Sequence, residues 1–329
     1  MAHRTLPYLM LASLLSTLAC SSKDTPPAPP QPPYSLEGFA LPGETFFPEG
    51  VAVAADGTFF AGSLSNGQIV RLPAGKEVAE EFAPPGVVST ATGLLVDDAL
   101  GVLWACDASL RQSTPAIVGF ALADGAVRAR HPFPAGAALC NDLALDAAGN
   151  LYATDSLSPR ILRVAADRKL QQGAAEAWAT APAWQVGPGQ FGLNGIIVKG
   201  SDVYAVHTQN NALYRIPIVA GGAAGAVGSV RLDRTPNGLD GLKLAENGNL
   251  LFVEVYANSL TYIALGAGDT GTLRVLADGL NGPTTFALFA GSAWVVEGQL
   301  DKLFNPSSGS PSLPFRVRRV QLEAGLAKP

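Results

Sequence analysis

One phrase recurs six times along this chain of 329 residues, at spacings of 42 to 53 residues. In each copy a turn residue leads into an apolar strand, a polar turn follows, and a second apolar strand completes the phrase. The copies begin at Glu49, Thr92, Asn141, Asn194, Asp240 and Gly282. Repeats of this length with several strands each are typical of β-propellers. The sequence therefore predicts an all-β, six-bladed propeller.

Each repeat contains further strands beyond the first pair. In the third repeat Ile161–Val164 reads as a third strand. Fourth strands are predicted near Val78–Phe82, Val127–Phe133, Ala175–Ala179, Ser229–Leu232 and Leu273–Leu276. We therefore expect about four antiparallel strands per blade, and the 36 Gly and 25 Pro residues suit many short strands joined by turns. To close the ring, Phe315–Leu322 is expected to supply a late strand of the last blade and Tyr34–Ala40 its outermost strand.

The first 33 residues are predicted to be a targeting signal followed by a tether. Residues 1–20 have a cationic start, a short apolar stretch and the ending Leu-Ala-Cys, which resembles a bacterial lipoprotein signal with Cys20 as the lipidated residue. Residues 21–33 are rich in proline and form a predicted tether. The propeller is expected to occupy residues 34–329. These features predict a protein of the bacterial cell envelope, anchored by lipid to the outer membrane and facing the periplasm or the exterior.

The charge of the chain argues against nucleic-acid binding. The formal net charge is −5, with 22 Lys and Arg residues, and the sequence contains no basic run that would favour a phosphate backbone. It also contains no apolar run of about 18 residues or more, so a membrane-spanning helix is not expected. A monomer is the default expectation.

The first residues of the six phrases point to a metal site. Equivalent positions in a propeller lie at one height around one axis, so Glu49, Asn141, Asn194 and Asp240 should converge at the mouth of the central channel. Taken singly, Asn or Asp beside Gly is a common turn residue. Four oxygen ligands in one register, two of them carboxylates, instead predict a hard divalent cation. Ca²⁺ is favoured, Mg²⁺ and Mn²⁺ are alternatives, and the absence of His or Cys from the ring disfavours Zn²⁺.

Four segments in this register carry a family resemblance. Phe-Pro-Glu-Gly-Val-Ala, Cys-Asn-Asp-Leu-Ala-Leu-Asp, Leu-Asn-Gly-Ile and Leu-Asp-Gly-Leu resemble the metal-site segments of the regucalcin, gluconolactonase and luciferin-regenerating enzyme superfamily. The resemblance extends from Glu49 to about Glu297. It implies a six-bladed propeller with a divalent metal in the channel, and hydrolysis of lactones, other esters or organophosphates. It also implies that Glu49, Asn194 and Asp240 are metal ligands, and that Asn141 contacts metal or substrate.

Further roles follow from this resemblance and from the order of the strands. Asp240 is the first candidate for the base or nucleophile, as proposed for its counterparts in relatives. Asp142 is expected to orient the Asn141 amide. His207, at the end of a second strand, is the other candidate base. Thr92 and Gly282 occupy the remaining ring positions, and both are expected to line the substrate pocket together with Trp184, although aromatic side chains more often pack between blades.

Two questions stay open at the level of sequence. Cys106 and Cys140 lie in adjacent repeats, and they could form a disulfide or act as small buried side chains, the second being the more common role. The function could be metal-dependent hydrolysis of a small lactone or ester. Alternatively, the propeller could be a non-enzymatic module that binds a protein, glycan or small ligand, with a metal that serves stability.

Overall fold

The computed structural model describes Met1, residues 38–110 and residues 114–328. The predicted signal segment with Cys20, the tether and Tyr34 lie outside these described residues. Among the described residues, none of the helices has the length and apolar character needed to cross a membrane.

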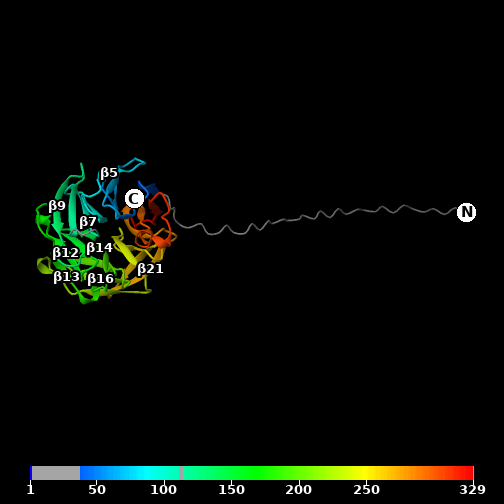
Figure 1. Cartoon of the computed structure of the whole chain (residues 1–329). Coiled ribbons are helices and arrows are strands. Elements are labelled where there is room, and N and C mark those ends of the chain that lie inside the picture. The colour runs from blue at the N-terminus through cyan, green and yellow to red at the C-terminus, as the bar shows by residue number, and fades with distance from the viewer. Residues whose placement is uncertain (2–37, 111–113, 329) are drawn as a thin grey trace. The chain divides into compact units, whose positions relative to one another are not determined.

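The described chain consists mainly of four-stranded antiparallel units that follow one another along the sequence and around the molecule (Figure 1). The first unit contains β2 (Pro48–Val53), β3 (Phe59–Ser63), β4 (Ile69–Leu72) and β5 (Glu80–Ala83). The second contains β6 (Ala91–Asp97), β7 (Val102–Asp107), β8 (Ala116–Ala121) and β9 (Val127–Pro132). The third contains β10 (Cys140–Leu145), β11 (Leu151–Asp155), β12 (Arg160–Val164) and β13 (Glu176–Thr180).

The next two units form one eight-stranded sheet. The first half contains β14 (Leu193–Lys199), β15 (Asp202–His207), β16 (Ala212–Pro217) and β17 (Gly228–Leu232). The second half contains β18 (Leu239–Leu244), β19 (Leu250–Glu254), β20 (Ser259–Gly266) and β21 (Thr270–Ala277). The halves join through their outermost strands, because β17 and β21 pair in parallel at Arg231–Thr270 and Leu232–Gly271. The expected six separate sheets are therefore five sheets by hydrogen bonding.

The ring closes as the sequence predicts. The last sheet has the order β1 (Gly38–Ala40), β24 (Arg316–Gln321), β23 (Ser292–Glu297) and β22 (Pro283–Phe289). The start of the described chain thus supplies the outermost strand beside its end, and Figure 1 shows the blue and red ends of the domain side by side. The predicted fourth strands are also confirmed, as β5, β9, β13, β17 and β21.

The innermost strands form a closed circle. In chain order β2, β6, β10, β14, β18 and β22 each contact the next, and β22 returns to β2. The core lies in layers between neighbouring sheets: one cluster combines Ile69 of the first unit with Leu94, Leu103 and Phe120 of the second. Short helical turns lie in the connections: η1 (Ala166–Arg168), η2 (Pro182–Trp184), η3 (Ala220–Gly222), α1 (Leu300–Phe304) and η4 (Pro306–Ser308). An all-β propeller fold therefore surrounds one central channel.

Candidate metal centre and cavity

The six innermost strands share a register irregularity directly after their first residue pair. In each innermost strand the shift lies between two of its own residues, namely Pro48 and Val51, Ala91 and Leu94, Cys140 and Leu143, Leu193 and Ile196, Leu239 and Leu242, or Pro283 and Phe286. Such bulges re-aim side chains. The residue that follows the first pair is Glu49, Thr92, Asn141, Asn194, Asp240 or Thr284.

The register corrects one sequence-based assignment. Thr284, rather than Gly282, occupies the ring position of the last unit, because Pro283 makes the first pair of β22 with Glu297. Gly282 lies two residues earlier, where the sequence pattern alone does not distinguish the turn from the strand. Thr284 Oγ1 donates to the Glu49 carbonyl at 2.8 Å, as Thr92 Oγ1 donates to the Cys140 carbonyl at 2.8 Å. Both threonines therefore tie one innermost strand to the next.

Three of the four candidate ligands, Glu49, Asn194 and Asp240, are followed by a glycine that close packing of the innermost strands requires. A Cβ at Gly195 would lie 2.5 Å from the Asp240 carbonyl oxygen, and one at Gly50 would collide with the Thr92 carbonyl oxygen. These contacts are closer than a side chain tolerates, so glycine is the residue that fits. The Asn-Gly and Asp-Gly pairs therefore belong to strands that line the channel, whereas such pairs alone usually mark turns.

The four predicted ligands share one cavity. Glu49, Asn141, Asn194 and Asp240 line a cavity of about 570 Å³, and Thr92 and Gly282 line the same cavity. The four side chains are 6–9% exposed. The sequence-predicted ring of oxygen-bearing side chains is thus brought together at a single opening of the channel.

Burial and neighbouring negative charges disfavour ionisation of the two carboxylates of this ring. Burial, then the charges of Asp240 and Asp142, raise the pKa of Glu49 well above its usual range, and Lys243 opposes the rise. Burial and Asp142 likewise raise the pKa of Asp240, against hydrogen bonds from Asn194 and the Gly241 backbone. Glu49 Oε2 is buried and has no hydrogen-bond partner among the described residues. A buried, unpartnered carboxylate oxygen is costly unless a cation accompanies it.

Asp142 differs in its contacts from the sequence-based expectation. Its Oδ2 is 3.3 Å from Lys243 Nζ and accepts from the Ile196 N–H at 3.3 Å, while Oδ1 accepts from the Leu143 N–H. These bonds tie β10 to β14 and β18, and none of them involves the Asn141 amide. Asp142 therefore acts in the channel as a third carboxylate with its own ammonium partner.

The charges in this part of the channel would be balanced by one divalent cation. Three carboxylates (Glu49, Asp142 and Asp240) and one ammonium (Lys243) act on one another. When all are ionised, two negative charges are uncompensated. The donor set of two carboxylates and two amides is what a hard cation prefers. Among the described residues, no group of three or more His, Cys, Asp or Glu side chains forms a metal cluster, so carboxylate and imidazole side chains alone do not reveal this site.

A second set of acidic residues holds the loops that lead into the ring. Four carboxylates each end the second strand of a unit and accept from a backbone N–H just before the innermost strand of the same unit. They are Asp107, Asp155, Glu254 and Glu297. Each also pairs with an arginine, namely Arg130, Arg160, Arg234 or Arg318. The pairs fix the approach to the ring positions, so these carboxylates are structural.

His207 occupies the corresponding place in the fourth unit and is held by the backbone. Nδ1 accepts from the Asn210 N–H at 3.1 Å, and Nε2 lies 3.3 Å from the Trp184 carbonyl. Burial lowers the pKa of His207. His207 and Trp184 are fully buried and lie outside the set of described residues that line the cavity. The structure therefore does not bring His207 to the lining of the cavity, and Trp184 packs in the core between sheets.

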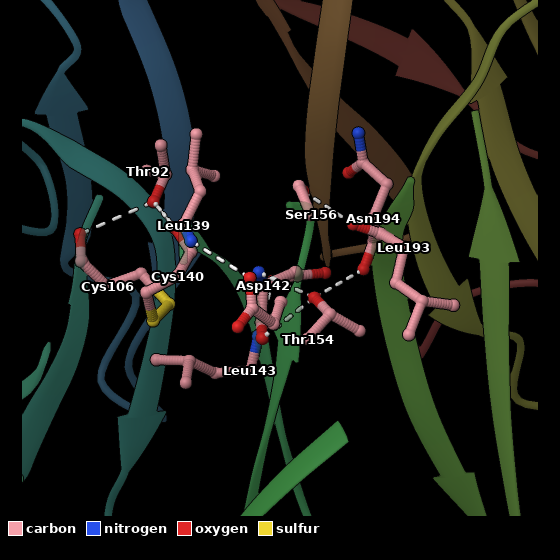
Figure 2. The surroundings of a disulfide bond; sticks show 11 residues. Thr92, Cys106, Leu139, Cys140, Asp142, Leu143, Thr154, Ser156, Leu193 and Asn194 are labelled. Atoms are coloured by element: carbon pink, nitrogen blue, oxygen red, sulfur yellow. Dashed lines mark hydrogen bonds between the residues drawn. A yellow bond between two sulfur atoms is a disulfide. The ribbon is translucent and has the colours of Figure 1, made fainter. Parts of the chain in front are cut away.

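A disulfide lies next to the candidate metal centre. Cys106 at the end of β7 bonds to Cys140 at the start of β10, with the Cα atoms 5.2 Å apart (Figure 2). The sequence left two roles open for these cysteines, and in the structure they form the disulfide. Cys140 directly precedes Asn141, and its carbonyl accepts from Thr92. The disulfide thus joins two neighbouring sheets directly beside the candidate ligand Asn141.

Loss of this disulfide is expected to lower stability. The bond closes a loop of 34 residues in sequence separation, which corresponds to about 3–4 kcal/mol of loop-closure entropy. We expect the Cys106→Ser/Cys140→Ser variant to unfold at lower urea concentration, with a loss of about 3 kcal/mol. Reductant should destabilise the wild-type protein by a similar amount and leave the variant unchanged. Equal stability of oxidised and reduced wild-type protein would show that the bond contributes nothing.

The sequence did not indicate the residues of α1 that form part of the outer wall of the cavity. Leu300, Asp301, Lys302 and Phe304 line it from α1, which lies in the long connection between β23 and β24. The signal available in the sequence was the length of that connection, since the equivalent turns of other units are only a few residues long. Phe191, which lies just before β14, lines the cavity as well.

Comparison with known proteins supports the fold. A family model described as "Strictosidine synthase-like, N-terminal" matches residues 35–72, and no curated protein matches the chain. Similar solved structures include the calcium-binding protein regucalcin from Agrobacterium tumefaciens, with 15% identity, 88% of this chain and 96% of that chain covered, and a TM-score of 0.61.

Two further solved structures are similar to this chain. Luciferin-regenerating enzyme has 12% identity, with 89% of this chain and 99% of that chain covered and a TM-score of 0.66. A protein described as a candidate gluconolactonase has 15% identity, with 88% and 94% covered and a TM-score of 0.60. At these identities the similarity concerns the fold. The chain therefore has the propeller fold of regucalcin and luciferin-regenerating enzyme, as its sequence motifs predict.

Proposed function

We propose that this protein is a divalent-metal-dependent hydrolase of lactones or related esters. The observation that carries the proposal is the pair of buried carboxylates, Glu49 and Asp240, at the floor of an open cavity with an unpartnered Glu49 oxygen. Such a floor favours binding of a cation, and the cavity above it has the size of a small-molecule site. Ca²⁺ is the expected ion, with Mg²⁺ and Mn²⁺ as alternatives.

The proposal includes a six-bladed architecture. The six innermost strands that contact one another in a closed circle support it, as do the six equivalent bulges. In this interpretation β14–β17 and β18–β21 are two blades whose outer strands touch. One ring position per blade then gives four oxygen ligands and two threonines.

The chain's own residues suit ester hydrolysis in the following way. A bound divalent cation supplies Lewis-acid polarisation of a carbonyl oxygen. Glu49, Asn141, Asn194 and Asp240 would hold that cation and leave the cavity side open. Asp240 lines the cavity and is the group best placed to accept a proton from an attacking water or to attack the carbonyl carbon.

The cellular setting is part of the same proposal. Cys20 would anchor the protein by lipid to the bacterial outer membrane, and residues 21–33 would hold the propeller away from the membrane surface. The substrate would then be a small lactone or ester of the cell envelope, met by a monomer.

The alternative is a binding propeller in which the metal serves stability. The discriminating experiment removes metal with chelator, restores Ca²⁺, Mg²⁺, Mn²⁺ or Zn²⁺ in turn, and follows hydrolysis of γ- and δ-lactones and an aryl ester. We expect turnover to disappear with chelator and to return best with Ca²⁺. Tight Ca²⁺ binding without turnover of any substrate would instead favour the binding propeller.

A further inference from the structure

The cavity is polar at its floor and apolar at its mouth. The floor consists of the nearly buried Glu49, Asn141, Asn194 and Asp240. At the mouth lie large apolar side chains that are strongly exposed: Phe191 is 39%, Phe304 55% and Tyr256 68% exposed. Exposed apolar groups gathered around one opening mark a binding surface, whereas isolated ones carry no such meaning.

Two of these aromatic residues come together from separate loops. Phe191 precedes β14 and Phe304 ends α1, yet their ring centroids are 6.5 Å apart. Leu64 and Leu300 line the same cavity. The aromatic pair and the leucines form an apolar wall on which a flat ring or an alkyl chain can pack.

The polar residues of the cavity wall are largely engaged by the protein itself. Thr208 Oγ1 accepts from Asn194 and donates to the Leu239 carbonyl. Lys302 Nζ pairs with Asp301 and donates to the Ser308 carbonyl. The Asn258 amide oxygen accepts from the Gly282 N–H. A polyhydroxylated ligand would therefore compete with these bonds above the floor, and burying its hydroxyls without partners is unfavourable.

We infer that the cavity takes lactones or esters with an apolar body, an alkyl chain or aryl group, and discriminates against sugar lactones. The inference rests on the proposed function for the reacting group, and on the Phe191–Phe304 wall for the apolar body. The ester carbonyl lies at the floor while the apolar body packs against this wall.

The test compares γ-valerolactone, γ-octalactone, γ-undecalactone and gluconolactone with the Ca²⁺-supplied protein. We expect kcat/KM to rise at least about tenfold from the shortest to the longest alkyl chain, and to be lowest for gluconolactone. Phe191→Ala and Phe304→Ala should each flatten this dependence, mainly by raising KM. Leu170→Ala is the matched control, because Leu170 is exposed (42%) and lies outside the described cavity lining.

A binding measurement separates this inference from the hydrolase proposal. N-octyl-pyrrolidone is a lactam that esterases do not cleave, and its binding is measured by calorimetry with and without Ca²⁺. Binding that weakens about tenfold in Phe304→Ala, without turnover of any lactone, would uphold the apolar site and reject hydrolysis. Turnover that is equal along the alkyl series, or fastest with gluconolactone, would overturn the inference while keeping the hydrolase. The absence of both turnover and lactam binding would overturn both.

Discussion

Asp240→Asn is expected to remove metal-induced stabilisation while making the metal-free protein more stable. The substitution deletes a charge that a cation needs, so Ca²⁺ affinity should fall by about 100-fold or more. It also removes a buried carboxylate whose charge is unfavourable beside Asp142, so the chelator-treated variant should melt above the chelator-treated wild type. Thermal unfolding with and without Ca²⁺ measures both effects, and lactone turnover should be lost.

The matched control for this prediction is Asp301→Asn. Asp301 also lines the cavity, but its side chain is 58% exposed and pairs with Lys302. Exposed pairs contribute little, so this variant should keep wild-type stability, Ca²⁺ response and turnover. Asp240→Asn that retained both metal binding and activity would remove Asp240 from the ligand set and from the chemistry.

The metal-free and Ca²⁺-bound proteins are expected to respond to pH in opposite directions. The raised pKa values of Glu49 and Asp240 mean that the folded, metal-free protein binds more protons than the unfolded chain above about pH 4.3. Its free energy of unfolding should therefore fall as pH rises through the raised pKa values. With saturating Ca²⁺ both groups are held ionised, protons compete with the metal, and stability should rise with pH.

Thermal unfolding between about pH 5 and about pH 8 checks this divergence. His207 acts in the opposite direction to the two carboxylates of the metal-free protein. Because the pKa of His207 is lowered in the fold, the free energy of unfolding decreases as pH falls below the usual pKa of histidine. The Glu49→Gln/Asp240→Asn variant retains His207 and removes the pair, so the difference between wild type and variant isolates the two carboxylates. Parallel curves for the metal-free and Ca²⁺-supplied wild type would contradict a cation at this site.

The repeat pattern predicted the fold because a propeller imposes the same physical demands on every unit. Each unit needs alternating apolar strands, turns between them and one residue at the channel mouth, so the order β2–β5 reappears in each unit. Closure by β24 and β1 was also predictable, since exposed strand edges are unfavourable. The parallel contact of β17 with β21 was not, because it depends on how two outer edges meet.

The candidate site was predictable where it depends on repeat position and not where it depends on irregular segments. Glu49, Asn141, Asn194 and Asp240 share one register, and the structure brings them to one cavity. Thr284 was missed because a two-residue ambiguity between turn and strand is resolved by hydrogen bonding alone.

Irregular segments account for the other misses. The wall formed by α1 lies in an insertion without repeat equivalents, so no periodicity could place it. His207 occupies a repeated position, but the local turn of Asn210 and the Trp184 carbonyl decide its contacts.

The most direct test of the metal centre is calorimetric titration of Ca²⁺ into the chelator-stripped protein. The charge balance of the channel predicts one ion bound per chain in the wild type and in Asp301→Asn, and binding lost in Glu49→Gln. Absence of binding heat together with an unchanged melting temperature in excess Ca²⁺ would contradict a metal centre at these four residues. Equal binding by Glu49→Gln would show that the ion sits elsewhere.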